Sequence, residues 1–326
     1  MNIKPLAIAI SVLFTGAAAA GEIYKSDDNT VELSGWAKGI AIYVDADAGD
    51  KEPHVFTDAH LKVKGTHQLN EDAKLIGSFA INAGDSITKA GRNAEFADIK
   101  LEFDHTTYGN FSFGDTGNSF GVLGKAKQGE GSNLYQISQG GVDGQGIRYK
   151  KKVNDLEFSA NYETDSDSDT ESNYAASLNY KTDDFSAAVA YGSDGKDANS
   201  VGLAGDVTVG DFKIGAAFIS FENAASLKAS DSVELSLDKL IPNDGETYSV
   251  AAAYTFDCFK VYGSLQYADA DVQGKAAEAK TAYLGLGYDV TDSFKTDFVV
   301  QTGSVEKPDG KKEDGYGLKF VAKYSF

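Results

Sequence analysis

The residues that could do chemistry in this sequence are few and scattered. A hydrolytic nucleophile needs a base within hydrogen-bond reach, usually a histidine that a carboxylate orients. No serine and aspartate are grouped with any of the four histidines, which are His54, His60, His67 and His105. The single cysteine, Cys258, stands in an expected two-residue turn. The sequence therefore predicts no enzyme, no catalytic residue and no cofactor.

Two further motifs are typical of loops. The glycine-rich stretch at 140–144 is followed by no helix start, so it does not predict a phosphate cradle. The acidic run at 165–171 could bind Mg²⁺ or Ca²⁺ that bridges to lipopolysaccharide, but a solvated loop is favoured, and no metal site is assigned. The formal net charge is −19, or −20 without Lys4, which argues against nucleic acid as a partner.

The remaining chemistry is electrostatic, because charged side chains recur at alternate positions. In a β-strand every second side chain lies on the same face. Seven basic residues share the polar face of four expected strands: Lys38, His60, Lys62, Lys64, Lys100, Arg148 and Lys150. The acids expected near them are Asp98 and Glu102 on a strand and Glu130 in a loop.

Strands must position these charges, because two-residue alternation dominates the chain after Thr30. In Leu156–Glu163, for example, apolar and polar side chains alternate throughout. The pattern predicts an all-β, transmembrane antiparallel barrel of about sixteen strands. We expect them at 31–43, 54–68, 74–82, 94–104, 109–115, 145–150, 156–163, 173–180, 185–192, 198–208, 212–222, 246–256, 259–268, 279–289, 294–302 and 315–326.

The expected connections alternate between short and long. Short turns are expected at 181–184, 210–211, 257–258 and 290–293. Long loops are expected near 44–53, 83–93, 116–144, 223–245 and 303–314. Short turns on one rim and long loops on the other are typical of outer-membrane barrels. Aromatic residues flank the short turns, as Tyr180 and Phe185 do, which is typical of a membrane interface.

The first twenty residues are typical of a secretory signal peptide. Lys4 precedes an apolar run, Leu6–Phe14, and Ala18-Ala19-Ala20 offers a cleavage site. No later run approaches the roughly 18 apolar residues that a membrane helix needs. We therefore expect a single barrel domain at 21–326, located in the cell outer membrane.

Closure of the barrel makes the polar face an interior face. Hydrocarbon offers no hydrogen-bond partner, so a spanning sheet leaves no free edge. About sixteen strands enclose a space too wide for side chains to fill, which predicts an aqueous channel. The opposite, outward face of the first strand is unusually small, which suits close approach of another protein wall. Its residues are Gly35, Ala37, Gly39 and Ala41.

Both ends of the mature chain resemble one family. Gly21–Gly35 (GEIYKSDDNTVELSG) resembles the opening of the enterobacterial and vibrio general porins, which are Gram-negative outer-membrane proteins. Tyr324-Ser325-Phe326 is similar to their aromatic C-terminal signature, and Ala59–Gly65 resembles their second strand.

The resemblance implies a homotrimer of sixteen-stranded barrels that passes ions and small hydrophilic solutes by passive diffusion. It implies that the third extracellular loop, at 116–144, folds into the lumen and faces a basic ladder on the wall. It also implies trimer contacts through the first strand and a role for Tyr324 and Phe326 in insertion. The implied partners are outer-membrane lipid, lipopolysaccharide and the barrel-assembly machinery.

Two departures leave the preferred solute open. Trp36 stands where the family commonly has a base, and Glu130 stands in Gly-Glu-Gly where an acid-rich segment containing proline is common. An oligosaccharide-specific porin would need an aromatic track, for which the candidates are Trp36, Tyr135, Tyr262 and Tyr283. A barrel that acts mainly as an adhesin or phage receptor would use its long loops.

Overall fold

The computed structural model describes residues 21–47, 51–84, 94–130, 146–164, 172–193, 198–223, 244–272 and 274–326. The expected signal peptide, residues 131–144 of the expected inward loop, and the acidic run at 165–171 lie outside these ranges. Within them, no helix is long and apolar enough to cross a membrane.

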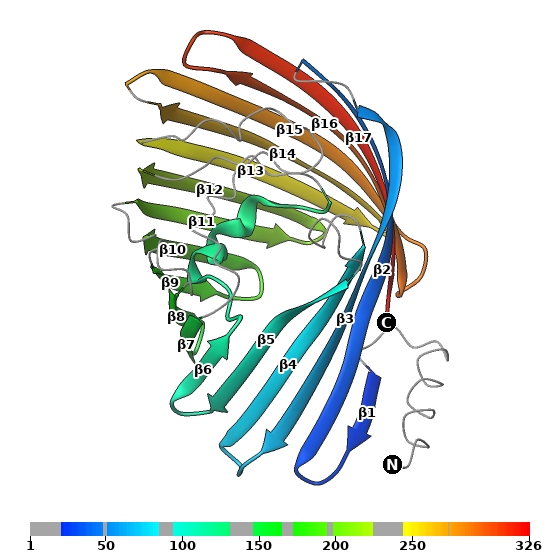
Figure 1. Cartoon of the computed structure of the whole chain (residues 1–326), viewed down its shortest axis with the longest axis vertical. Helices are drawn as coiled ribbons and strands as arrows, with labels where there is room; N and C mark the ends of the chain where they lie inside the picture. Colours follow the sequence, from blue (N-terminus) through cyan, green and yellow to red (C-terminus); the bar gives the residue numbers. More distant parts are fainter. Residues whose placement is uncertain are drawn as a thin grey trace.

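The described residues form one antiparallel sheet that closes on itself (Figure 1). Sixteen strands, β2 to β17, each pair with their sequence neighbours, and β17 pairs with β2 to complete the ring. The predicted sixteen-stranded barrel is confirmed. The strands are β2 (Asn29–Ala46), β3 (Lys51–Gln68), β4 (Ala73–Gly84), β5 (Ala94–His105), β6 (Gly109–Gly114), β7 (Gly146–Val153), β8 (Leu156–Glu163), β9 (Asn173–Lys181), β10 (Phe185–Ser193), β11 (Asn199–Val209), β12 (Phe212–Glu222), β13 (Asp244–Phe256), β14 (Phe259–Asp271), β15 (Ala276–Asp289), β16 (Phe294–Glu306) and β17 (Lys312–Ser325).

A short strand that the sequence did not predict, β1 (Gly21–Lys25), precedes the ring. It pairs with the first half of β2, whereas β17 pairs with the second half. The backbone of Phe326 joins the two regions, because it exchanges N–H···O bonds of 2.9 and 3.0 Å with Gly35. The seam of the barrel therefore contains both the first and the last of the described residues.

The prediction of long loops at 44–53 and 303–314 is wrong. Residues 44–53 and 303–314 largely continue their strands, since β2 runs to Ala46, β3 begins at Lys51, β16 runs to Glu306 and β17 begins at Lys312. Backbone pairing between β17 and β2 extends to Gly315 and Ala46. The ladder continues where the apolar alternation of the sequence has already faded, so the alternation underestimates these strands.

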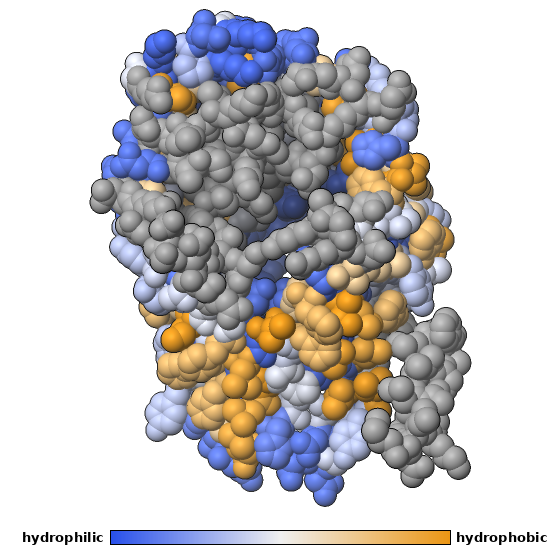
Figure 2. Space-filling view, viewed as in Figure 1, coloured by the Kyte–Doolittle hydropathy of each residue, from blue (hydrophilic) through white to orange (hydrophobic). Residues whose placement is uncertain are grey.

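The wall presents large apolar side chains outward. Leu265 is 68% exposed and Leu284 is 62% exposed, whereas lumen-facing Ser264 and Gln266 are at most 5% exposed. Figure 2 shows hydrophobic residues gathered on the lower half of one face, above a hydrophilic lower rim. Such an apolar exterior around a polar interior is what a barrel in lipid requires.

Loss of the terminal residue is expected to impair folding. Besides its two backbone bonds, the Phe326 ring lies against Gly35, where an added Cβ would stand 2.7 Å from the ring. We expect deletion of Phe326 to lower the amount of heat-modifiable folded barrel, because the seam loses these contacts. A Phe320→Ala variant, altered at an outward position within β17 that is 45% exposed, is the control. Equal yields of both variants would contradict the expectation.

Candidate functional site

The segment that follows β6 enters the barrel and binds its wall. Arg148 of β7 donates from Nη1 to the carbonyl oxygen of Thr116 at 2.9 Å. The backbone N–H of Ser119 donates to Oδ1 of Asn161 at 2.6 Å, and the Ser119 hydroxyl lies 2.7 Å from that of Ser159. Asn161 and Ser159 are buried residues of β8. The start of the segment is thus fixed to the lumen side of β7 and β8.

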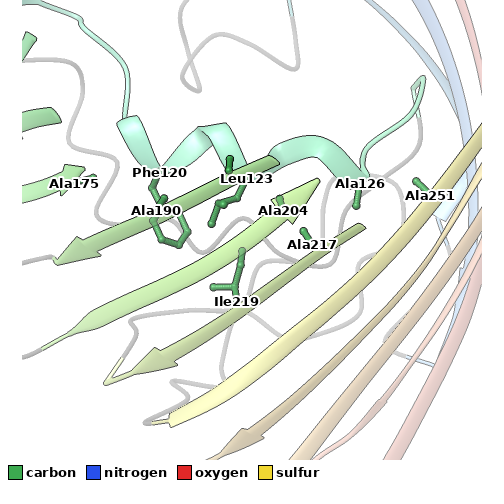
Figure 3. Packing of buried hydrophobic residues seen from close by; sticks show 10 residues of the cluster. Phe120, Leu123, Ala126, Ala175, Ala190, Ala204, Ala217, Ile219 and Ala251 are labelled. Atoms are coloured by element: carbon green, nitrogen blue, oxygen red, sulfur yellow. The ribbon is translucent and has the colours of Figure 1, made fainter. Parts of the chain in front are cut away.

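The short 3-10 helix η1 (Ser119–Ala126) then packs across the inner wall (Figures 1 and 3). Phe120, Leu123 and Ala126 are at most 7% exposed. Burial of a leucine or phenylalanine side chain stabilises a fold by about 1.5–3 kcal/mol. The wall residues that contact this face are mostly alanines of β9 to β13: Ala175, Ala188, Ala190, Ala204, Ala217, Ile219 and Ala251.

The helix lies so close to the wall that one wall position has no room for a side chain. A Cβ at Gly215 of β12 would stand 2.1 Å from the carbonyl oxygen of Lys125. The Lys125 ammonium group lies 3.7 Å from the Asp206 carboxylate, which Lys213 also approaches at 3.2 Å. Burial lowers the pKa of Lys125, and the charge of Asp206 opposes that change. Steric fit and charge together hold η1 against β11 and β12.

Two buried tyrosines hold the end of the segment. The Tyr283 hydroxyl accepts from the N–H of Gln128 at 3.1 Å and donates to its carbonyl oxygen at 3.0 Å. The Tyr262 hydroxyl accepts from the N–H of Glu130 at 3.2 Å and donates to Asp297 at 2.8 Å. The segment 115–130 is therefore anchored from β7 round to β14 and β15.

The segment brings one carboxylate to the opposite wall. Glu130 lies 3.6 Å from the ammonium group of Lys38 on β2 and 3.9 Å from that of Lys319 on β17. These side chains are between 18% and 28% exposed. The Glu130 contact therefore brings charges of both signs together on the lumen side of β2 and β17.

An aromatic pair lies beside this contact. Trp36 of β2 and His60 of β3 are register partners, and their rings stack with centroids 5.7 Å apart. The Lys38 ammonium group lies 4.8 Å from the centroid of the Trp36 ring. Nδ1 of His60 lies 2.7 Å from Oδ1 of Asn82. Trp36, Lys38 and His60 therefore share the lumen face, as their alternation predicted.

Three of the other expected wall lysines are paired with carboxylates. Lys64 lies 2.8 Å from Glu32, Lys100 lies 2.9 Å from Glu102, and Lys150 lies 3.7 Å from Glu157. Lys62 shares the face of Lys64 and pairs with no carboxylate of the described residues. The pairs reduce the basic character of the wall, because much of its positive charge is neutralised locally.

Arg148 lies with several of these charges in one cavity of about 390 Å³. The cavity is also lined by Lys100, Glu102, Lys150 and Glu157. The Arg148 side chain donates from Nε to the Ser159 hydroxyl at 2.9 Å, in addition to its bond to Thr116. Its guanidinium group therefore holds the inward segment as well as contributing charge.

Asp98 interrupts the alternation that placed it on the lumen face. Lys100 pairs with Ser78 and Ala97 pairs with Ala80, so Asp98 and Ile99 form a bulge opposite a single residue of β4. The backbone of Asp98 has a φ of 52°, in the left-handed region that aspartate tolerates better than most residues. Alternation alone cannot place a side chain at such a bulge.

The sequence reading missed the contribution of the last strands. Lys319 and Lys323 of β17 and Lys260 of β14 carry charge into the lumen beside the segment. Lys319 and Lys323 alternate on the polar face of the terminal strand, and in a closed barrel that strand lies next to the first one. Closure of the barrel therefore predicts that Lys319 and Lys323 lie near the charged residues of the first strand.

The small outward face of β2 is only partly open. An added Cβ at Gly39 would meet no atom within 4 Å, whereas at Gly35 it would meet the Phe326 ring. Ala37 and Ala41 alternate with these glycines on the same outward face. Among the described residues, Phe326 covers Gly35, and the part of this face left open is Ala37, Gly39 and Ala41.

Solved structures resemble this fold closely despite low sequence identity. A loop L8 deletion mutant of OmpT, an outer-membrane protein of Vibrio cholerae, has a TM-score of 0.73 at 17% identity, over 92% of this chain and all of that chain. The trimer form of OmpT has a TM-score of 0.71 at 16% identity, over 92% of this chain and all of that one. OmpF of Salmonella typhi has a TM-score of 0.70 at 16% identity, over 94% of this chain and all of that one.

Sequence relatives agree with the fold. Outer membrane porin N of Escherichia coli K12 is 29% identical over 38% of this chain and 32% of its own length, and outer membrane protein YedS of Escherichia coli is 32% identical over 37% of this chain and 34% of its own. The match thus spans about a third of these relatives. The family model described as Gram-negative porin matches residues 7–309, so this chain belongs to the Gram-negative porin family of outer-membrane β-barrels.

Proposed function

We propose that the chain forms a water-filled channel for passive diffusion of ions and small hydrophilic solutes across the outer membrane. The observation that carries the proposal is the segment 115–130, which lies inside a sixteen-stranded barrel and brings Glu130 to the wall at Lys38 and Lys319. A barrel of this size leaves an aqueous passage unless something fills it. Here the inward segment narrows the passage.

We also propose that the assembly is a homotrimer. The open small face at Ala37, Gly39 and Ala41 supports close contact with another copy. The similar OmpT of Vibrio cholerae is described in a trimer form. Members of this family are channels rather than enzymes, and we propose no catalytic role.

Conductance tests both proposals. The refolded chain, added to a planar lipid bilayer, is expected to give stable ohmic steps, and each insertion is expected to close in three equal decrements. Heat-unfolded protein is the control, because it has no closed barrel. A folded protein that gives no steps would overturn the channel, and single undivided closures would overturn the trimer alone.

The oligosaccharide-specific alternative is not favoured. A sugar track needs aromatic faces open to the lumen, but Tyr262 is 1% exposed and Tyr283 is 6% exposed. Their hydroxyl groups bind the inward segment instead. Tyr135 lies outside the described residues, which leaves Trp36, and its ring is occupied by His60 and Lys38.

A further inference from the structure

Three lysines occupy matching positions on neighbouring strands at the seam of the barrel. Lys295 of β16 pairs in register with Lys323 of β17, and Lys323 pairs with Lys38 of β2. All three alternate with buried residues of the lumen face, such as Val321 on β17. Directly opposed residues have Cβ atoms about 5 Å apart, and like charges there repel. The three lysines are called the lysine row below.

The tryptophan ring gathers two of these charges. Trp36 lies two residues before Lys38, and both the Lys38 and the Lys323 ammonium groups lie over its ring, at 4.8 and 5.5 Å from the centroid. The negative face of an aromatic ring attracts cations. The ring therefore favours side-chain positions in which the two ammonium groups stay close to each other.

The carboxylates nearest the lysine row form ion pairs with its two outer lysines and not with Lys323. Glu130 lies 3.6 Å from Lys38, and Asp289 lies 3.1 Å from Lys295. Asp297 accepts a hydrogen bond from the Tyr262 hydroxyl at 2.8 Å. Asp58 pairs in register with Lys38, and the charges of Glu130 and Asp297 act on Lys323. No carboxylate of the described residues forms an ion pair with Lys323, which stands between the other two lysines.

We propose that the lysine row, centred on Lys323, is a binding subsite for a phosphate group, either free or carried by a small solute. A phosphate carries a charge of about −1.5 to −2 at neutral pH and three strong acceptor oxygens, so it can accept from neighbouring ammonium groups at once. A monovalent anion pairs with one of them and leaves the repulsion of the others. The subsite rests on the proposed channel only in that solutes reach it through the lumen.

Equilibrium binding tests the subsite without any transport measurement. Trp36 is the single tryptophan of the chain, so its fluorescence reports on the row directly. Inorganic phosphate is added to the folded barrel in detergent, with ionic strength held constant by sodium chloride. We expect a saturable change in Trp36 fluorescence, and at least a tenfold weaker apparent affinity in Lys323→Gln. A change that does not saturate, or an unaltered affinity in Lys323→Gln, would overturn the subsite.

Matched variants separate the row from general charge effects. Lys74→Gln removes a lysine that lies 3.1 Å from Asp104, away from the row, and should bind phosphate as the parent does. An equal loss in Lys74→Gln would overturn the assignment to the row. Lys38→Gln, expected to weaken binding as well, keeps the test decisive if Lys323→Gln does not fold.

The probe also identifies the source of the phosphate group. A hexose phosphate that binds as well as inorganic phosphate indicates a carried phosphate, and binding of inorganic phosphate alone indicates the free ion. An equal response to the uncharged hexose would overturn the proposal. A barrel that conducts but does not bind phosphate refutes only the subsite, whereas one that binds phosphate but does not conduct refutes only the channel.

Discussion

Deletion of residues 119–130 is expected to increase the single-channel conductance severalfold and to admit sugars that the parent excludes. The deleted residues include η1 and Glu130, which lie inside the lumen and contact both its sides. Without them the passage approaches the full bore of a sixteen-stranded barrel. Single-channel recording and liposome swelling with sugars of increasing size measure the change. An unaltered conductance and size limit in a folded variant would mean that the segment does not narrow the pore.

A point substitution provides a milder version of the same test. Leu123→Asp places a carboxylate at a position that is 2% exposed against the alanines of the wall, and burial of an unpaired charge is strongly unfavourable. We expect the segment to detach from the wall, so that the single-channel conductance rises and fluctuates more. Gly124→Asp is the matched control, because it adds the same charge next to Leu123 at an exposed position whose Cβ would meet no atom. Equal effects of the two variants would indicate a charge effect alone.

The strands could be predicted because each carries its own pattern. In lipid, every spanning strand alternates apolar and polar side chains, so alternation located all sixteen without tertiary information. Alternation did not predict β1, because Gly21–Lys25 lies outside the membrane-spanning wall and is held by pairing with β2. Alternation did not predict the ends of the strands for a similar reason. Pairing as far as Ala46 depends on the partner strand rather than on the local sequence.

The faces of the strands could be predicted, but their partners could not. Alternation placed Lys38, His60 and Arg148 toward the lumen, where the structure has them. Whether a lysine is neutralised depends on the register with the next strand, as for Lys64 with Glu32. Two-residue periodicity carries no information about register between strands.

The lumen-facing alanines beneath the inward segment are a sequence signal for its position. Polar residues are expected on the lumen side of a wide barrel, yet β10 to β13 place alanines there, including Ala190, Ala204 and Ala217. Small apolar residues facing water indicate that another part of the chain covers them. Only the folded structure shows which part of the chain covers these alanines, because η1 and β10 to β13 lie far apart in the sequence.

Reversal of the charge of Lys38, beside Glu130, is expected to change ion selectivity. Lys38, Lys319 and Lys323 lie near Glu130, while Asp58 pairs in register with Lys38 and the charge of Asp297 acts on Lys323. With charges of both signs so close together, we expect the parent to have weak selectivity or a lean toward anions despite its net charge of −19. Lys38→Glu should move the reversal potential in a salt gradient clearly toward cation selectivity.

Distance decides which wall charges matter for selectivity. Charges separated by more than a Debye length, about 8 Å at physiological salt, are largely screened from each other. Lys64→Glu is the matched control, because Lys64 pairs with Glu32, which precedes Lys38 by six residues on β2, or roughly 20 Å at about 3.3 Å per residue. It should shift the reversal potential much less than Lys38→Glu. Screening of distant acids should also make the parent more anion-selective as salt rises. A strongly cation-selective parent that Lys38→Glu leaves unchanged would show that the selective point lies elsewhere in the barrel.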